Sequence, residues 1–193
     1  MNAVFEVCRK EWGYLHTNPL KDVSRPTAPP ARRRGVSQEE IEAVLAGLHW
    51  SEDLLVTKSQ QVACLFLLAL ETAMRKGEML SLTPETCHLD QQYVVLPATK
   101  NGDRRQVPLS KRAVELLKKV KCRFTVSSAS ADALFRKISP SGLHFHDSRS
   151  EGITRLAKKL EILDLARAIG HRDPKSLMWY YAETASDLAK KLD

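Results

Sequence analysis

The sequence lacks any hydrophobic run long enough to cross a membrane. Its longest uninterrupted apolar run, Val62–Leu70, has nine residues, whereas a transmembrane helix needs about 20. The start of the chain also lacks the apolar block of a signal peptide, because polar and charged residues stand there instead. We therefore expect a cytoplasmic protein without a membrane partner.

Paired cysteines are lacking as well. The four cysteines are far apart in the sequence, and no two of them form a C-x-x-C pair. Neither a structural zinc site nor a disulfide framework is therefore indicated. We expect reduced thiols at Cys8, Cys64, Cys87 and Cys122.

The composition is ordinary for one globular domain with a short appendage. The chain has 193 residues, of which 43% are hydrophobic and 27% are charged. A chain of this length and composition can bury a single sizeable core. No internal repeat or low-complexity tract is visible.

Positive charge is concentrated in one stretch. The chain has a net charge of +7, and residues 100–123 contain nine Lys or Arg against Asp103 and Glu115, so this basic stretch carries the whole excess. Such a stretch is a plausible contact for the phosphate backbone of DNA. On charge alone, a solvated helix face beside a lysine-protected hairpin edge explains it about equally well.

The chain divides by composition into three parts. Residues 1–19 show the pattern of a short amphipathic helix, which stops at an Asn-Pro pair. Residues 20–36 are rich in proline and contain three consecutive arginines, as expected of an extended basic linker. A capping box, Ser37-Gln38-Glu39-Glu40, then opens the globular domain of residues 37–193.

The pattern within the globular domain predicts a mainly helical α+β fold. A helix follows the capping box, residues 59–73 are apolar nearly all round, as in a central core helix, and residues 74–82 continue as a short helix. Three β-rich segments predict a small antiparallel three-stranded sheet. These segments are 88–90, 93–96 and 105–109. Ser110 is expected to cap a helix to about Val120 and Ser130 to cap another through Ile138, and further helices are expected at about 146–160, 161–169, 174–182 and 186–192.

Six polar residues are candidates for chemistry, although each has an ordinary explanation when taken alone. An arginine three residues before Glu78 can form an exposed helical ion pair, and a lysine at a hairpin tip can protect a sheet edge. A histidine and an arginine three residues apart can aim at one anion near a helix start, but such a histidine is also often a buried structural group. A histidine after a glycine can cap a helix, and a tyrosine among aromatics is usually packed. The six residues are Arg75, Lys100, His146, Arg149, His171 and Tyr180.

The order and spacing of these groups carry more information than any one of them. Arginine in an E-T-x-M-R-x-G-E element is followed by lysine on a β-hairpin, by H-x-x-R, by Gly-His, and by tyrosine nine residues later. This succession resembles the catalytic domain of the tyrosine recombinases, the phage integrase family, over roughly Gly35 to Leu192. The start of the linker resembles the joint at which the core-binding domain of that family ends, which would make residues 1–19 a helical remnant of that domain.

The resemblance implies a role for each residue. Tyr180 would be the nucleophile, with Tyr181 as the alternative, and Arg75 and Arg149 would clamp the phosphate. Lys100 would be the general acid, while His146 and His171 would support proton transfer and hydrogen bonding. The family cuts DNA through a 3′-phosphotyrosine and a free 5′-hydroxyl, so neither a metal nor a nucleotide cofactor is expected.

Two positions depart from the family pattern. The family often has a histidine and then a small hydroxyl residue after the second arginine, whereas this chain has Ser150 and Glu151. A carboxylate at this point would weaken phosphate binding if it pointed into the site.

The resemblance also implies partners. Double-stranded DNA is the expected substrate, in the cytoplasm of a bacterial host cell, and the last helix, residues 186–192, is expected to dock on a neighbouring copy in a homo-oligomer. Two alternatives remain: a topoisomerase-like nicking and closing activity that uses the same residues, and a non-catalytic DNA-binding remnant of an integrase.

Overall fold

The computed structural model describes residues 1–24, 26–27, 34–53, 57–97, 104–140, 142–171 and 173–181. The chain forms two compact units, residues 1–32 and residues 33–193, and each is described here by itself. Within the described ranges, no helix has both the length and the hydropathy that a membrane crossing requires. All four cysteines are free, as expected from their spacing.

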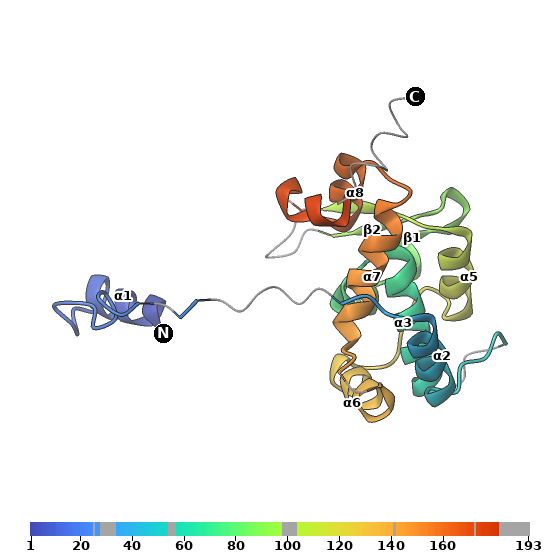
Figure 1. Ribbon diagram of the computed structural model, residues 1–193, viewed down its shortest axis with the longest axis horizontal. Coiled ribbons are helices and arrows are strands. Elements are labelled where there is room, and N and C mark those ends of the chain that lie inside the picture. Colours follow the sequence, from blue (N-terminus) through green and yellow to red (C-terminus); the bar gives the residue numbers. More distant parts are fainter. Residues whose placement is uncertain are drawn as a thin grey trace. The chain divides into compact units, whose positions relative to one another are not determined.

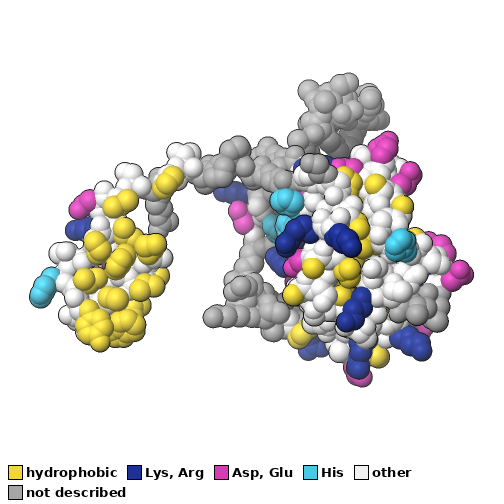
Figure 2. Space-filling model, turned by 90° about the horizontal axis from the view of Figure 1, so that it is seen from below, with side chains coloured by type: hydrophobic (Ala, Val, Ile, Leu, Met, Phe, Trp, Pro, Cys, Tyr) yellow, Lys and Arg dark blue, Asp and Glu magenta, His cyan; other side chains and the backbone are white. Residues whose placement is uncertain are grey.

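In the part of the first unit that the structure describes there is one helix, α1 (Asn2–Lys10). The expectation of a helix over residues 1–19 was therefore too long, because Gly13 adopts a left-handed φ of +66° and turns the chain. After that turn, the amide of Asn18 donates to Asn2 and Glu6 on α1 and holds the returning segment. Figure 2 shows hydrophobic side chains gathered on the displayed face of this unit, and its exposed large ones are Met1, Val4, Trp12, Tyr14 and Val23.

The second unit is organised around α3 (Lys58–Thr72), which is buried along nearly its whole length. It follows α2 (Gln38–Gly47), whose capping box of Ser37 and Glu40 confirms the predicted helix start. The prediction of a central core helix is also confirmed. Figure 1 shows α3 in the middle of the helices, with α7 (Phe145–Ala157) beside it.

A break separates α3 from α4 (Lys76–Leu80). Ala73 ends α3 in the left-handed conformation, with φ of 52°, and Arg75 is extended. The predicted helix over 74–82 was therefore wrong at its start, because Met74 and Arg75 precede the helix. This break turns the Ala73 carbonyl and the Arg75 side chain away from the helical repeat.

The predicted three-stranded antiparallel sheet is confirmed, in the order β1, β2, β3. The segment predicted over 88–90 was wrong at its end, because the strand is Cys87–His88 and Leu89 begins a 3₁₀ helix. Tyr93 and Arg105 begin the two longer strands, and Leu96 pairs with Arg105 in the rung next to the residues that connect them. The predicted tip, including Lys100, lies outside the described residues. The elements of this region are η1 (Pro84–Thr86), β1 (Cys87–His88), η2 (Leu89–Gln91), β2 (Tyr93–Leu96) and β3 (Arg105–Pro108).

The later helices agree with the prediction except at their ends. Ser110 caps α5 (Lys111–Lys119) as expected, but α6 (Ser128–Ile138) is capped by Ser127 and not by Ser130, whose N–H donates to the Ser127 hydroxyl. The chain continues through α7 to α8 (Ile162–Ile169) and the 3₁₀ helix η3 (Pro174–Tyr181). The predicted helix over 186–192 lies outside the described residues.

The hydrophobic core has two parts. The larger joins α2, α3, the sheet, α5 and α6, while the smaller lies where α7, α8 and η3 meet. Leu177 of η3 is completely buried in the smaller part. The segment that carries Tyr180 is therefore attached by its own apolar anchor, whose members are Ala73, Ile153, Leu165, Ala166, Ile169 and Leu177.

Candidate active site

Arg75 lies at the start of α4 and is bound there by Glu78. The Arg75 N–H donates to Glu78 Oε2 at 2.8 Å, and its guanidinium donates to Oε1 at 2.9 Å. The ion pair expected from the sequence therefore forms, but through the helix cap and not along a helix face. The Arg75 side chain is 48% exposed, so its charge is accessible from the solvent side.

Arg149 on α7 is the buried counterpart, with 5% of its side chain exposed. Its guanidinium donates to the carbonyl of Ala73, at the break after α3, and to the carbonyl of Ile169 at 3.2 Å. Burial, followed by the Arg75 cation, lowers the pKa of Arg149 to about 10, so the group stays charged at neutral pH. Arg149 thus connects three segments that are far apart in the sequence.

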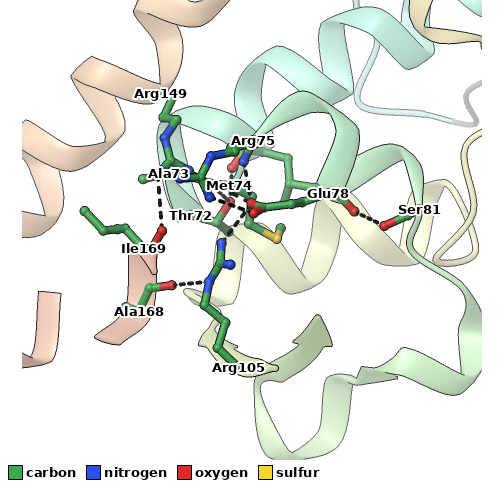
Figure 3. A network of polar contacts seen from close by, with 11 residues as sticks. Thr72, Ala73, Met74, Arg75, Glu78, Ser81, Arg105, Arg149, Ala168 and Ile169 are labelled. Atoms are coloured by element: carbon green, nitrogen blue, oxygen red, sulfur yellow. Dashed lines mark hydrogen bonds and ion pairs between the residues drawn. The ribbon is translucent and has the colours of Figure 1, made fainter. Parts of the chain in front are cut away.

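Glu78 is the common anion of the site. Its Oε2 accepts 2.8 Å hydrogen bonds from the Arg75 N–H and from the Arg105 guanidinium, and it lies 4.0 Å from the Arg149 guanidinium. In Figure 3 the three arginines point toward this carboxylate. Burial acts to raise the pKa of Glu78, but the hydrogen bonds from Arg75 and Arg105 outweigh it and hold the pKa below its ordinary value.

Arg105 belongs to the site although the sequence identifies it only as one cation of the basic stretch. Its Nε donates to the carbonyl of Ala168 at 3.3 Å, and only 12% of the side chain is exposed. The guanidinium lies against Gly170, where a Cβ would come within 2.8 Å of Arg105 Cζ. Spacing along the chain contains no signal for this contact, since 65 residues separate the two positions.

The two histidines lie near Arg149. His146 is in the first turn of α7, and His171 follows Gly170, which ends α8 with φ of 70°. His171 Nδ1 is 2.8 Å from the Ser176 hydroxyl of η3. Loss of hydration, and then the Arg149 cation, lower the pKa of both imidazoles, which keeps them neutral near pH 7 and able to accept a proton.

The two adjacent tyrosines have different surroundings. Partial burial raises the pKa of Tyr180, while a hydrogen bond with Ser150 and the charge of Arg149 act against that rise. Its ring contacts that of Trp179, with centroids 3.8 Å apart. The Tyr181 hydroxyl instead donates to the carbonyl of Leu160 at 2.6 Å.

The two departures from the expected pattern are explained by their contacts. Ser150 lies beside Tyr180 and acts to lower the pKa of its phenol. Glu151 points elsewhere, because one carboxylate oxygen accepts from Arg155 at 2.9 Å and the other from the Val36 N–H at 3.4 Å. The structure therefore does not direct this carboxylate toward Arg149.

An open cavity of about 600 Å³ adjoins this cluster. Its lining includes Arg75 and Arg105, the two arginines that bind Glu78 most closely, so a ligand in the cavity would meet positive charge. Among the residues that the structure describes, no three His, Cys, Asp or Glu side chains gather as metal ligands would. The lining consists of Arg75, Gly77, Glu78, Ser81, Leu96, Pro97 and Arg105.

The remaining basic stretch is partly neutralised. Arg112 and Lys119 both bind Glu52, and Arg112 also pairs with Glu115 at 3.2 Å. Its exposed cations, among the described residues, lie at the end of the hairpin and on and after α5: Arg104, Lys111, Lys118, Lys121 and Arg123.

Together these groups can bind and activate a phosphodiester. The guanidinium groups of Arg75 and Arg149 offer paired donors to non-bridging oxygens. The phenol of Tyr180 and the neutral imidazoles of His146 and His171 lie around the buried Arg149. Five of the six residues selected from the sequence therefore converge, and Lys100 lies outside the described residues.

Comparison with known proteins agrees with this geometry. The family model described as "Phage integrase family" matches residues 36–139. A "Putative integrase/recombinase" of Haemophilus influenzae is 35% identical over 98% of this chain and 66% of its own length, and a "Shufflon-specific DNA recombinase" of Escherichia coli is 34% identical over 100% and 51%.

A crystal structure of a lambda integrase dimer bound to a COC′ core site shares the fold. Its TM-score is 0.68 at 18% identity, and the match covers 93% of this chain and 56% of that chain. The present chain spans between about half and two thirds of the length of the two sequence relatives. Because the family model matches more than half of the residues of this chain, the chain belongs to the phage integrase family.

Proposed function

We propose that the chain carries the catalytic part of a site-specific DNA recombinase, which cuts and rejoins double-stranded DNA through a 3′-phosphotyrosine. In this proposal residues 37–193 are the catalytic domain, residues 20–36 the linker and residues 1–19 part of a core-binding domain. The integrase and recombinase names of its relatives support the proposal, and the DNA-bound lambda integrase dimer has the same fold.

The observation that carries the proposal is the convergence of Arg75 and Arg149. The first reaches Glu78 Oε1 at 2.9 Å and the second lies 4.0 Å from Oε2, although the two arginines are 74 residues apart in the sequence. A phosphodiester under attack gains negative charge on its non-bridging oxygens, and guanidinium pairs stabilise that charge. Tyr180 lies close enough to Arg149 for the cation to affect its pKa.

The proposed reaction is a transfer between two oxygens. The Tyr180 oxygen attacks phosphorus, the bond from phosphorus to the 5′-oxygen breaks, and Lys100 protonates the departing oxygen. His146 and His171, neutral near pH 7 because their pKa values are lowered, accept and relay the phenolic proton. The phosphotyrosine retains the energy of the broken bond, so the reverse reaction rejoins the strand without ATP.

A nicked DNA substrate tests the proposal. A pool of nicked duplexes with randomised sequence is incubated with the chain, the short cleaved fragment diffuses away, and the covalent adduct is isolated under denaturing conditions and sequenced. We expect an adduct on the strand that ends in the 3′-phosphate at the break, with a free 5′-hydroxyl on the other side, and we expect its loss in Tyr180→Phe. Tyr181→Phe is the matched control, because it removes the neighbouring hydroxyl, and it should retain the adduct.

Other outcomes would decide against the proposal. An adduct that persists in Tyr180→Phe and disappears in Tyr181→Phe assigns the nucleophile to the other tyrosine. Salt-sensitive DNA binding without any adduct supports the non-catalytic DNA-binding alternative. Relaxation of a supercoiled plasmid without strand exchange supports the nicking and closing activity.

We further propose that the protein acts as a homo-oligomer on DNA in the cytoplasm of a bacterial cell. The dimeric state of the lambda integrase complex supports this assembly. Sedimentation of the chain with and without the enriched duplex measures it, and one copy per duplex at saturation would contradict it.

A further inference from the structure

We propose that Arg105 is a positioning residue of this site, which holds the start of β3 against the Gly170-His171 turn and against Glu78. This role rests on the proposed function, since the groups that Arg105 would position are those assigned to strand cleavage. Arg105 acts through them and does not itself bind the reacting phosphate.

The first support is the set of contacts made by one guanidinium. Nη2 donates to Glu78 Oε2 at 2.8 Å, and Nε donates to the carbonyl of Ala168 at 3.3 Å. One side chain from the sheet thus binds both α4 and the last turn of α8. The neighbouring carbonyl, that of Ile169, accepts from Arg149, so both arginines hold the same turn.

The second support is the fit between Arg105 and Gly170. A Cβ at Gly170 would come within 2.8 Å of both Cζ and Nη1 of Arg105 and within 2.9 Å of Nε. The flat guanidinium therefore occupies the space that any side chain at Gly170 would need. The glycine serves two purposes, because its φ of +70° also lets α8 end directly before His171.

The third support is the place of Arg105 in the hairpin. It pairs with Leu96 in the last rung of the β2–β3 ladder, and residues 97–104, which include Lys100, join the two strands. Arg105 therefore fixes the first residue of β3 against the turn that carries His171.

The electrostatics agree with the geometry. The Arg105 cation contributes, after burial and the other arginines, to the lowered pKa of His171, and it helps to lower the pKa of Glu78. Loss of the cation should therefore raise the pKa of His171. Because only 12% of the side chain is exposed, its loss should alter the rate of cleavage more than the affinity for DNA.

The test compares Arg105→Ala, Arg105→Lys and Arg167→Ala. Arg167 is the control, since it is also an arginine, has 79% of its side chain exposed and pairs only with Asp164 among the ion pairs of the described residues. For each variant, single-turnover adduct formation and affinity are measured on the enriched nicked duplex from pH 5 to 9, a range in which histidines titrate. Thermal unfolding establishes whether each variant folds.

We expect both Arg105 variants to cleave on the order of 100-fold more slowly, as displaced catalytic groups do, with little change in affinity. Arg105→Lys keeps the charge but loses the planar fork of donors, so its slow cleavage would show that geometry matters. The limb of the pH profile that reports His171 should move to higher pH in Arg105→Ala. Added methylguanidinium should partly restore the cleavage rate of that variant without changing its affinity.

A parallel loss of rate and affinity would overturn the proposal, because it would make Arg105 a DNA contact. An unchanged rate would overturn it as well. If the native chain forms no adduct, the proposed function fails separately, and His171 titration by NMR in the free protein still tests the anchor. A His171 midpoint that rises in Arg105→Ala but not in Arg167→Ala supports the anchor, and equal midpoints contradict it.

Discussion

The hydroxyl of Tyr181 donates a 2.6 Å hydrogen bond to the backbone carbonyl of Leu160, whereas the hydroxyl of its neighbour Tyr180 faces Ser150 and Arg149. These two successive residues of η3 therefore have different roles. One tyrosine ties the 3₁₀ helix to the segment before α8, and the other is directed into the site.

Tyr181→Phe should therefore weaken the fold but not the chemistry. Loss of one hydrogen bond of this kind lowers the free energy of unfolding by about 1 kcal/mol, which urea denaturation can measure. Tyr14→Phe, at an exposed tyrosine of the first unit, is the control and should leave that free energy unchanged. A Tyr181→Phe variant with native stability would contradict the anchoring role.

Ser150→Ala should slow cleavage by raising the pKa of Tyr180. The Ser150 hydrogen bond favours the ionised phenol, and a hydrogen bond to a charged group contributes about 1.5 kcal/mol or more, which corresponds to roughly tenfold in rate. The pH at which single-turnover cleavage reaches half its maximum should move upward. An unshifted pH profile would show that the contact does not assist the nucleophile.

Glu151→Gln, one residue further along α7, should leave the cleavage rate and its pH profile unchanged. Its carboxylate binds Arg155 and the Val36 N–H and not Arg149. The same nicked duplex serves for this measurement. Faster cleavage in Glu151→Gln would mean that the carboxylate weakens phosphate binding after all.

Gly152→Ala should destabilise the second unit and displace Arg149. A Cβ at Gly152 would lie 2.4 Å from the backbone oxygen of Ala69 on α3, so α7 would have to move away, and overpacking of this kind costs about 1–3 kcal/mol. Gly77→Ala is the matched control, since no atom lies within 4 Å of the point that a Cβ would occupy there in α4. Thermal unfolding should separate the two, with Gly77→Ala at least as stable as the native chain.

Glu78→Gln should destabilise the fold in a pH-dependent way. Because the pKa of Glu78 is lowered below 4.5 in the folded protein, its carboxylate stabilises the fold fully above pH 4.5, and this contribution is lost as the pH falls through the folded-state pKa. At pH 7 the loss should be about 3 kcal/mol, as for a broken buried ion pair.

Urea denaturation of the native chain and Glu78→Gln from pH 7 to pH 3 measures this difference, in the range where a carboxyl group titrates. The two curves should approach each other below pH 4.5. Glu115→Gln, at an exposed partner of Arg112, should follow the native curve throughout. A constant gap between native and Glu78→Gln would exclude titration of this carboxylate as the cause.

The parts that were predictable from the sequence depend on neighbours along the chain. The Ser37 and Ser110 caps and the three strands follow from side chains within a few residues of one another. The left-handed Ala73 was not predictable, because alanine there has no turn signal and the break is held by Arg149 from α7. The cap of α6 is Ser127 and not Ser130, although both residues have the required hydroxyl.

The sequence predicts which residues belong to the candidate site but not how they contact one another. The arginines, the histidines and the tyrosine could be selected by their order and spacing, because both can be read from the sequence alone. The sequence pairs Glu78 with Arg75 alone and marks Arg105 only as a cation in the basic stretch at the start of a strand, because the contact between Glu78 and Arg105 joins residues 27 apart on different elements. Ser150 looked like a departure until its contact with Tyr180 was visible.

The carboxylate of Glu78 also determines at which stage the neighbouring arginine side chains lose their conformational entropy. Immobilising a long arginine side chain costs about 2 kcal/mol of rotamer freedom, and here Glu78 draws in the side chains of Arg75, Arg105 and Arg149 as the chain folds. In the proposed reaction a DNA phosphate meets the donors of Arg75 and Arg149 already in place, so little of its binding energy goes into arranging them. In the free protein, Glu78 is the anion that pairs with these cations.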